Sequence, residues 1–262
     1  MMQIYRTLGC LCLAVLLMGS GARCEEPQGI VLNGKAGRLH IAADPRPLPA
    51  ALHLLSRTFS WRIGFEEARL AYPGDLVDMT SPTYAPKSPD DRAFDPRGGA
   101  LDIEFAVNER TQLPDEPTAV IRALLTEYER RGYPGKYSFT SEPGAGGYIY
   151  VFPEAAANTS GALQKATPVT TTRITVSVQE NQKLGSVLKE TCKLLQQKAG
   201  IRVLYVGHGG AVQTEFRPAP PVLAARDEPA YLFLNRAVAA VGFSYWQLVY
   251  DPGAKWYLLA YG

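Results

Sequence analysis

The chain has 262 residues, of which 46% are hydrophobic and 20% charged, and its formal net charge is +2. This composition excludes a disordered tail, and the length suits two domains of ordinary size. Because no run of Lys or Arg is longer than Arg130-Arg131, the sequence indicates neither a nucleic-acid-binding stripe nor a polybasic membrane patch.

The first 22 residues have the pattern of a secretory signal peptide. Arg6 precedes an apolar core over 8–18, and small residues follow at 19–22. This core is shorter than the roughly 20 apolar residues that span a bilayer. We therefore predict cleavage near Ala22 and a mature protein in the periplasm or another extracytoplasmic space, without a stable membrane span.

Cleavage would remove Cys10 and Cys12 and leave Cys24 and Cys192. Arg23 stands where a lipoprotein cleavage site normally has a small residue, so acylation of Cys24 is not predicted. In an oxidising compartment the two remaining cysteines have two interpretations. They form a disulfide, or Cys192 is a buried small apolar residue, which we favour because free cysteine is among the most buried residue types.

The region 30–153 is predicted to form a first α+β domain. Extended segments at 30–32 and 38–42 flank the turn signal Asn33-Gly34. A helix and a strand over 62–65 follow. The helix is predicted from apolar residues at helical spacing, which are Leu48, Ala51, Leu52, Leu55 and Phe59.

Between 71 and 99 the periodic pattern stops. Prolines stand there among Asp, Ser and Thr residues, and few apolar residues recur at regular spacing. Such a stretch is typical of a surface excursion, so we treat 71–99 as a proline-rich insertion in the first domain.

The region 173–262 repeats the order of the first. A strand at 174–178 leads into a helix over 184–199, which Gly200 ends before a strand at 201–206. Three further correspondences lie in the same order. They are 100–105 with 211–216, the Asp-Glu-Pro triplets at 115–117 and 227–229 that open predicted helices over 117–131 and 229–241, and the Pro-Gly-Ala turns at 143–145 and 252–254.

Several coincidences in one order indicate an internal duplication. The stretch 154–172 between the two regions is rich in Ala, Thr and Ser and is predicted to be a linker. Each copy has the order strand, helix, strand, strand, helix, strand, strand. The sequence therefore predicts two tandem two-layer α+β domains of βαββαββ type after the signal peptide.

The second copy carries a leucine ahead of an amphipathic helix, a glycine before a short hydrophobic strand, a second helix and a terminal hairpin. The residues of this pattern are Leu184, Leu188, Gly200, Val203, Phe216, Leu232, Leu234, Gly242 and Tyr257. The pattern resembles the short N-terminal domains of secretins and TonB-dependent receptors. The resemblance covers 173–262, and 38–152 when the insertion is set aside. It implies an envelope protein–protein contact module without catalytic residues.

The three histidines do not form a metal site by spacing. His53 lies off the apolar stripe of its helix and His40 lies in a predicted strand, so there is no i, i+4 pair of ligands. His208 stands in a Gly-His-Gly-Gly run of the kind found in oxyanion loops. The Gly-x-Ser-x-Gly elbow that should accompany it is missing from the sequence, and a glycine-rich turn explains the run.

Two further patterns suggest chemistry only weakly. Ser186 and Lys189 fit Ser-x-x-Lys, but the partner motifs Lys-Thr-Gly and Ser-Asp-Asn are missing from the sequence. Asp102 and Glu104 share one face of a predicted strand and could divide acid and base roles, yet simple alternation also explains them. The second copy has Gln213 at the matching position. We therefore predict no catalytic, cofactor-binding or metal-binding residues.

Our leading hypothesis is an exported, non-enzymatic envelope adaptor, linked to a secretion or outer-membrane transport assembly. It is expected to need no cofactor and to contact a protein partner by an edge strand or hairpin. The strand over 256–261 is expected near a sheet edge. Two alternatives stay open: a binder of cell-wall glycan or a small ligand through the aromatic hairpins, and an enzyme with a dispersed site.

Overall fold

The computed structural model describes residues 28–81, 92–142, 147–206, 218–220 and 223–262. Several features of the sequence lie outside these residues. They are the predicted signal peptide (1–22), Cys24, the middle of the 71–99 insertion, the first hairpin turn at 143–145, His208 and the predicted strand over 211–216.

The first half of the chain contains the helices α1 (Pro47–Phe59) and α2 (Pro117–Arg130), each with proline in its first turn, where no main-chain donor is lost. Its strands are β1 (Gly29–Asn33), β2 (Ala36–Asp44), β3 (Arg62–Glu66), β4 (Leu76–Asp78), β5 (Phe94–Pro96), β6 (Gly99–Ala106), β7 (Lys136–Ser141) and β8 (Tyr148–Ala157). The 3-10 helix η1 (Pro73–Asp75) precedes β4, and β4 pairs with β5 inside the insertion.

The second half contains the helices α3 (Leu184–Ala199) and α5 (Ala230–Ala239). Gly200 follows α3 at φ 66°, a left-handed conformation that suits glycine at the end of a helix. The remaining elements are β9 (Leu163–Lys165), the 3-10 helix η3 (Val169–Thr171), β10 (Arg173–Val176), β11 (Val203–Tyr205), β12 (Ala225–Pro229), β13 (Tyr245–Asp251) and β14 (Trp256–Tyr261). Helices and sheets in both halves confirm the α+β class.

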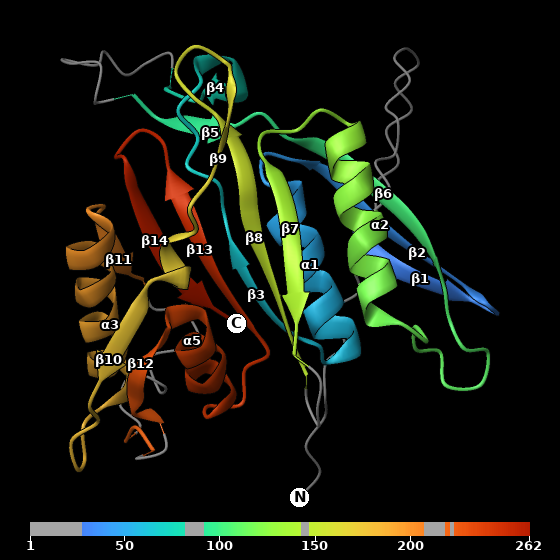
Figure 1. Ribbon diagram of the computed structural model, residues 1–262. Coiled ribbons are helices and arrows are strands. Elements are labelled where there is room, and N and C mark those ends of the chain that lie inside the picture. Colours follow the sequence, from blue (N-terminus) through green and yellow to red (C-terminus); the bar gives the residue numbers. More distant parts are fainter. Residues whose placement is uncertain (1–27, 82–91, 143–146, 207–217, 221–222) are drawn as a thin grey trace, which may run out of the picture.

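One large sheet runs through both halves of the chain (Figure 1). Its strand order is β11-β14-β13-β3-β8-β7, and β9 pairs with the end of β8. The halves join where β13 runs parallel to β3, in a register that sets Trp246 opposite Gly64 and Leu248 opposite Glu66. Besides the β4-β5 pair of the insertion, the described residues form two smaller antiparallel sheets, β1-β2-β6 in the first half and β10-β12 in the second.

Both halves use the same local strand arrangement. In the first, β3 runs parallel to β8, and β7 lies antiparallel on the other side of β8. In the second, β11 runs parallel to β14, and β13 lies antiparallel on the other side of β14. Each half also pairs the strand before its first helix with the strand before its second, as β2 with β6 and β10 with β12.

The helices of the two halves pack on opposite faces of the large sheet. Side chains alternate between the faces of a strand. On β8, Ile149 and Val151 belong to the core that contains α1 and α2, whereas Tyr150 belongs to the core that contains α3 and α5. On β13, Tyr245 joins the first of these cores and Trp246 the second. Each core is therefore built with strands from both halves.

Three segments differ from the sequence prediction. The strand over 256–261 is not at a sheet edge, because β14 lies between β11 and β13, so that prediction is wrong. The helix predicted over 229–241 spans Ala230–Ala239, since 225–229 pairs with β10 as a strand. The stretch 154–172, expected as a linker, carries the end of β8, then β9 and η3. Its composition is that of a linker, but β9 within it pairs with the end of β8 through main-chain hydrogen bonds, which composition does not indicate.

Within the described part of the chain, no helix is both long and apolar enough to cross a membrane.

The closest packing at the junction of the halves is that of Trp246 on Gly64. A Cβ atom added to Gly64 would lie 2.4 Å from two carbons of the Trp246 indole. The indole Nε1–H donates to Asn235 Oδ1 of α5 at 2.7 Å, which fixes the ring in place. Tyr150 packs on the same core and stacks on Tyr231 of α5, with ring centroids 4.4 Å apart. The missing side chain at position 64 is therefore a condition for joining the halves.

We predict that Gly64→Ala lowers the free energy of unfolding by about 1–3 kcal/mol, the usual cost of overpacking a core. Urea unfolding measures the loss. The double variant with Trp246→Leu supplies the control, because removing the indole should cancel part of the penalty of the added methyl group. If the loss in the double variant equals the sum of the losses for Gly64→Ala and Trp246→Leu alone, the two side chains do not interact and the assigned contact is wrong.

Candidate functional site

Glu66 and Glu67, at the end of β3, form a buried polar cluster between the halves. Glu66 is fully buried and its carboxylate accepts four hydrogen bonds. The donors are Val169 N–H at 2.5 Å, Thr170 N–H at 2.9 Å, the Thr170 hydroxyl at 2.6 Å and the Tyr150 hydroxyl at 3.1 Å. Burial raises the pKa of Glu66, while these hydrogen bonds favour the ionised form. This carboxylate therefore ties η3 to the first half.

Glu67 connects the first half to β13 and β14. Its carboxylate accepts the Arg46 Nε–H at 3.2 Å and the Tyr250 N–H at 2.8 Å. Its main-chain carbonyl accepts the Tyr257 hydroxyl at 3.1 Å. Arg46 also donates to Asp95 at 2.8 Å. Burial raises the pKa of Glu67 to about 7, although the charge of Arg46 acts in the opposite direction.

Both acids face donors that belong to the fold, so they hold segments of the chain together. Sequence reasoning missed them, because two adjacent acids after a short strand look like the start of a solvated loop. The only local signal is that Glu66 continues the run of 62–65, in which the described residues 63 to 66 are all buried.

A groove of about 680 Å³ opens beside this cluster, and we call it the junction groove. Apolar atoms of Val169, Ile201 and Tyr257 contribute to its wall, and no Asp or Glu is among its lining residues. Its cations come from three separate segments: Arg69 after β3, Lys165 on β9 and Lys198 in the last turn of α3.

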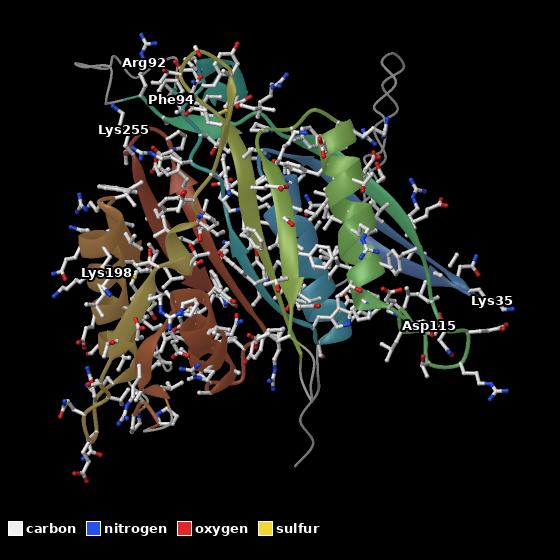
Figure 2. The ribbon with its side chains drawn as sticks, in the orientation of Figure 1. Lys35, Arg92, Phe94, Asp115, Lys198 and Lys255 are labelled. Carbon is white, nitrogen blue, oxygen red and sulfur yellow. The ribbon has the colours of Figure 1, made fainter. Side chains whose placement is uncertain are left out.

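Lys198 lies on α3 (Figure 2) and donates to the main-chain carbonyl of Arg173 at 2.6 Å. Arg69 and Lys165 have no ion-pair partner among the described residues. Three cations around an apolar wall, with no acid in the lining, give the groove a positive potential that favours an anionic ligand.

Two residues considered separately in the sequence come together in the structure. His40 Nδ1 lies 2.6 Å from Asp102 Oδ1, because the register of β2 with β6 sets them opposite each other. Arg38 and Arg131 also approach the Asp102 carboxylate, each at 3.6 Å. Glu104 is exposed two pairs further along, opposite Arg38. Asp102 is therefore the centre of an ion-pair cluster on the small sheet. It lies on the face of β6 opposite to that of the buried Leu101 and Ile103, which accounts for the alternation in the sequence.

The other residues weighed in the sequence are dispersed. The His53 ring stacks on Tyr245 at 5.0 Å, and the Lys189 ammonium lies 5.9 Å from the centre of the Tyr205 ring. Cys192 is 3% exposed, and burial raises the pKa of its thiol to about 12. Among the described residues, no group of three or more His, Cys, Asp and Glu side chains could hold a metal ion.

The large sheet ends at β7 on one side and at β11 on the other. Main-chain groups along a strand alternate between its two sides. The Glu142 N–H donates to the Tyr148 carbonyl of β8 at 2.9 Å. The N–H of Ser141 therefore points away from β8, as do those of Tyr137 and Phe139. We call this outer side of Lys136–Ser141 the β7 edge, and no described strand pairs with it.

Comparison of the chain with protein-family models, with curated proteins and with solved structures found no match.

We predict that stability falls as the pH rises from about 4.5 to about 7. Over this interval folded Glu67 keeps a proton that the unfolded chain, with an ordinary pKa of 4.5, has already lost. The contribution is complete below the unfolded pKa and is lost as the pH passes the folded value. Its size is on the order of 3 kcal/mol. Urea unfolding at several pH values measures it.

Glu67→Gln is the control for this effect, since the amide does not titrate. It should flatten the slope between pH 4.5 and pH 7, because no group at this position then takes up or releases a proton. Parallel curves for the two proteins would show that the slope comes from other groups.

Proposed function

We propose that this protein is an exported, non-enzymatic interaction module made of two copies of a βαββαββ unit, and that it binds a partner protein at the β7 edge. The observation that carries the proposal is the β13–β3 pairing: the molecule joins its own halves by adding one edge strand to another. The common strand arrangement of the halves, β3-β8-β7 and β11-β14-β13, supports two related copies.

The β7 edge suits strand addition because its donors and acceptors form a continuous row. Tyr137, Phe139 and Ser141 each direct a main-chain N–H outward, and strand addition uses such groups for affinity. The side chains of Ser138 and Thr140 are small, which leaves the opposite face of β7 accessible. The N-terminal pattern over 1–22 supports export, and the resemblance to secretin and TonB-receptor domains supports a role in an envelope assembly.

Ser141→Pro tests the edge directly. Proline removes an outward donor that has no described partner and should leave the melting temperature nearly unchanged. When the variant is immobilised and exposed to an envelope extract, it should retain about one tenth or less of the partner protein that the wild type retains, because main-chain pairing with the partner is lost. Quantitative mass spectrometry of the retained proteins measures the difference.

Thr140→Pro is the matched control, because the Thr140 N–H faces β8. This variant should melt at a lower temperature, which distinguishes inward from outward donors on the same strand. Undiminished retention of the same partner by a folded Ser141→Pro protein would refute binding at the β7 edge.

The junction groove favours a second function, the binding of an acidic cell-wall glycan or another small anion. Its support is the placement of Arg69, Lys165 and Lys198 around one cavity whose lining has no carboxylate. Such a ligand would contact Arg69 of the first half together with η3 and the end of α3, and so stabilise the joined halves.

A melting series with acidic and neutral cell-wall saccharides tests this second function, since a ligand that binds only the folded state raises the midpoint. Acidic saccharides should raise it in the wild type and not in the double variant Arg69→Gln, Lys165→Gln. Lys193→Gln, an exposed change on α3 outside the groove, should respond like the wild type. Equal responses in all three proteins would exclude the groove.

A further inference from the structure

The two ends of the large sheet are complementary to each other. At the junction, β13 is the first hairpin strand of its half, and β3 is the strand that follows the first helix of its half. The free ends are strands of these same two kinds: β7 is the first hairpin strand of the first half, and β11 follows the first helix of the second. One molecule therefore presents both partners of the junction that it already contains.

The directions of the strands agree with this pairing. β13, β3 and β8 run one way, whereas β14, β11 and β7 run the other way. The halves keep the same strand order along the sheet but reverse strand direction and carry their helices on opposite faces. A half-turn about the hydrogen-bonding direction, with a shift along it, relates them. A second such step restores the orientation, so β7 of one molecule would run parallel to β11 of the next.

The register follows from the central strands. Ile63 pairs with Ile149 as Val203 pairs with Tyr257, so Leu204 corresponds to Gly64 and Val206 to Glu66. Matching the hairpins in the same way makes Tyr137 correspond to Trp246 and Phe139 to Leu248. This follows because Val151 then corresponds to Leu259, and these residues pair with Phe139 and Leu248.

The contact between molecules does not repeat the glycine of the junction, because Leu204 stands where Gly64 does. The junction sets Trp246 against Gly64. The equivalent contact between molecules sets Tyr137 against Leu204, and Phe139 against Val206. Val206, directly after β11, is 45% exposed in the single chain, and Phe139 is half-buried. Pairing would cover both.

We propose that the partner at the β7 edge is a second copy of this chain, which adds its β11 in parallel and so extends the sheet head to tail. This inference rests on the proposed function in taking the β7 edge as the docking strand. Because the contact joins two different surfaces, it does not close on itself as a two-fold dimer does. The twist of the sheet would make the product a short helical row.

Sedimentation velocity of the mature chain over a wide concentration range gives the first test. The mean mass should rise beyond that of a dimer as the concentration increases. Val206→Lys places a charge at the contact and should weaken self-association by about tenfold or more. Val31→Lys, the same change at a 67% exposed valine of β1, should behave as the wild type. A wild type that stays monomeric, or that stops at a dimer, would overturn the proposal.

Polarity gives the second test, in a Cys24→Ser background with a short bismaleimide cross-linker. Ser141→Cys and Val206→Cys are both exposed changes on the same face of the paired strands. A mixture of the two single variants should give one cross-linked heterodimer, each variant alone should give none, and the double variant should give a ladder. Homodimers in either single variant at the yield of the mixture would overturn head-to-tail pairing.

The two proposals fail separately. If Ser141→Pro abolishes retention of another envelope protein while the wild type stays monomeric at all concentrations, binding at the β7 edge stands and self-assembly is wrong. If self-assembly occurs and neither Ser141→Pro nor Val206→Lys weakens it, the copies do not meet at these edges and self-assembly through them is wrong, whereas binding of another protein at the β7 edge is still decided by the retention experiment.

Discussion

The parallel pairing of β13 with β3 is the contact on which the rest of the structure depends. It places strands of both halves in each of the two cores, so that Tyr245 packs with α1 and Tyr150 packs with α5. Separating the halves would expose these aromatic rings to water, at a cost of roughly 25 cal/mol for each Å² of apolar surface. Gly64 makes the contact possible, because the indole of Trp246 occupies the volume of a side chain there.

The buried acids beside this pairing complete it at a cost. Taking a carboxylate out of water is unfavourable by several kcal/mol unless hydrogen bonds replace the lost solvation. Glu66 receives that replacement from η3 and from Tyr150, and Glu67 receives it from Arg46 and Tyr250. The donors on η3 and β13 lie more than a hundred residues away from the acids in the sequence. The cluster is satisfied only when the halves and their connection are all in place.

The sequence predicted the local elements well, for a physical reason. The periodicity of residues such as Leu52 and Leu188 depends on one face being buried, and this is a property of each helix by itself. The order of strands in the sheet is not local. Trp256–Tyr261 comes last in the chain, yet β11 covers the side that was expected to be open. Nothing in the residues of β14 indicates which strands flank it.

The candidate site was less predictable still. Glu66 and Glu67 have meaning only beside Thr170 and Tyr250, which lie far away in sequence, and neither acid forms part of a spaced motif. The pairing of His40 with Asp102 required the register of β2 and β6, although both residues had been noticed. The linker over 154–172 was judged by composition, which does not show main-chain hydrogen bonds such as that from Ala166 to Glu154.

The lengths of the end strands bear on how strongly the sheet edges can bind. β7 has six residues, but β11 has only three, so few main-chain hydrogen bonds can form across a β7–β11 contact. Short edge strands are one way in which proteins avoid uncontrolled edge-to-edge association. Apolar side chains such as Leu204 and Val206 must then supply much of the affinity. A contact of this kind is weak for each pair, so it can be made and released without unfolding either molecule.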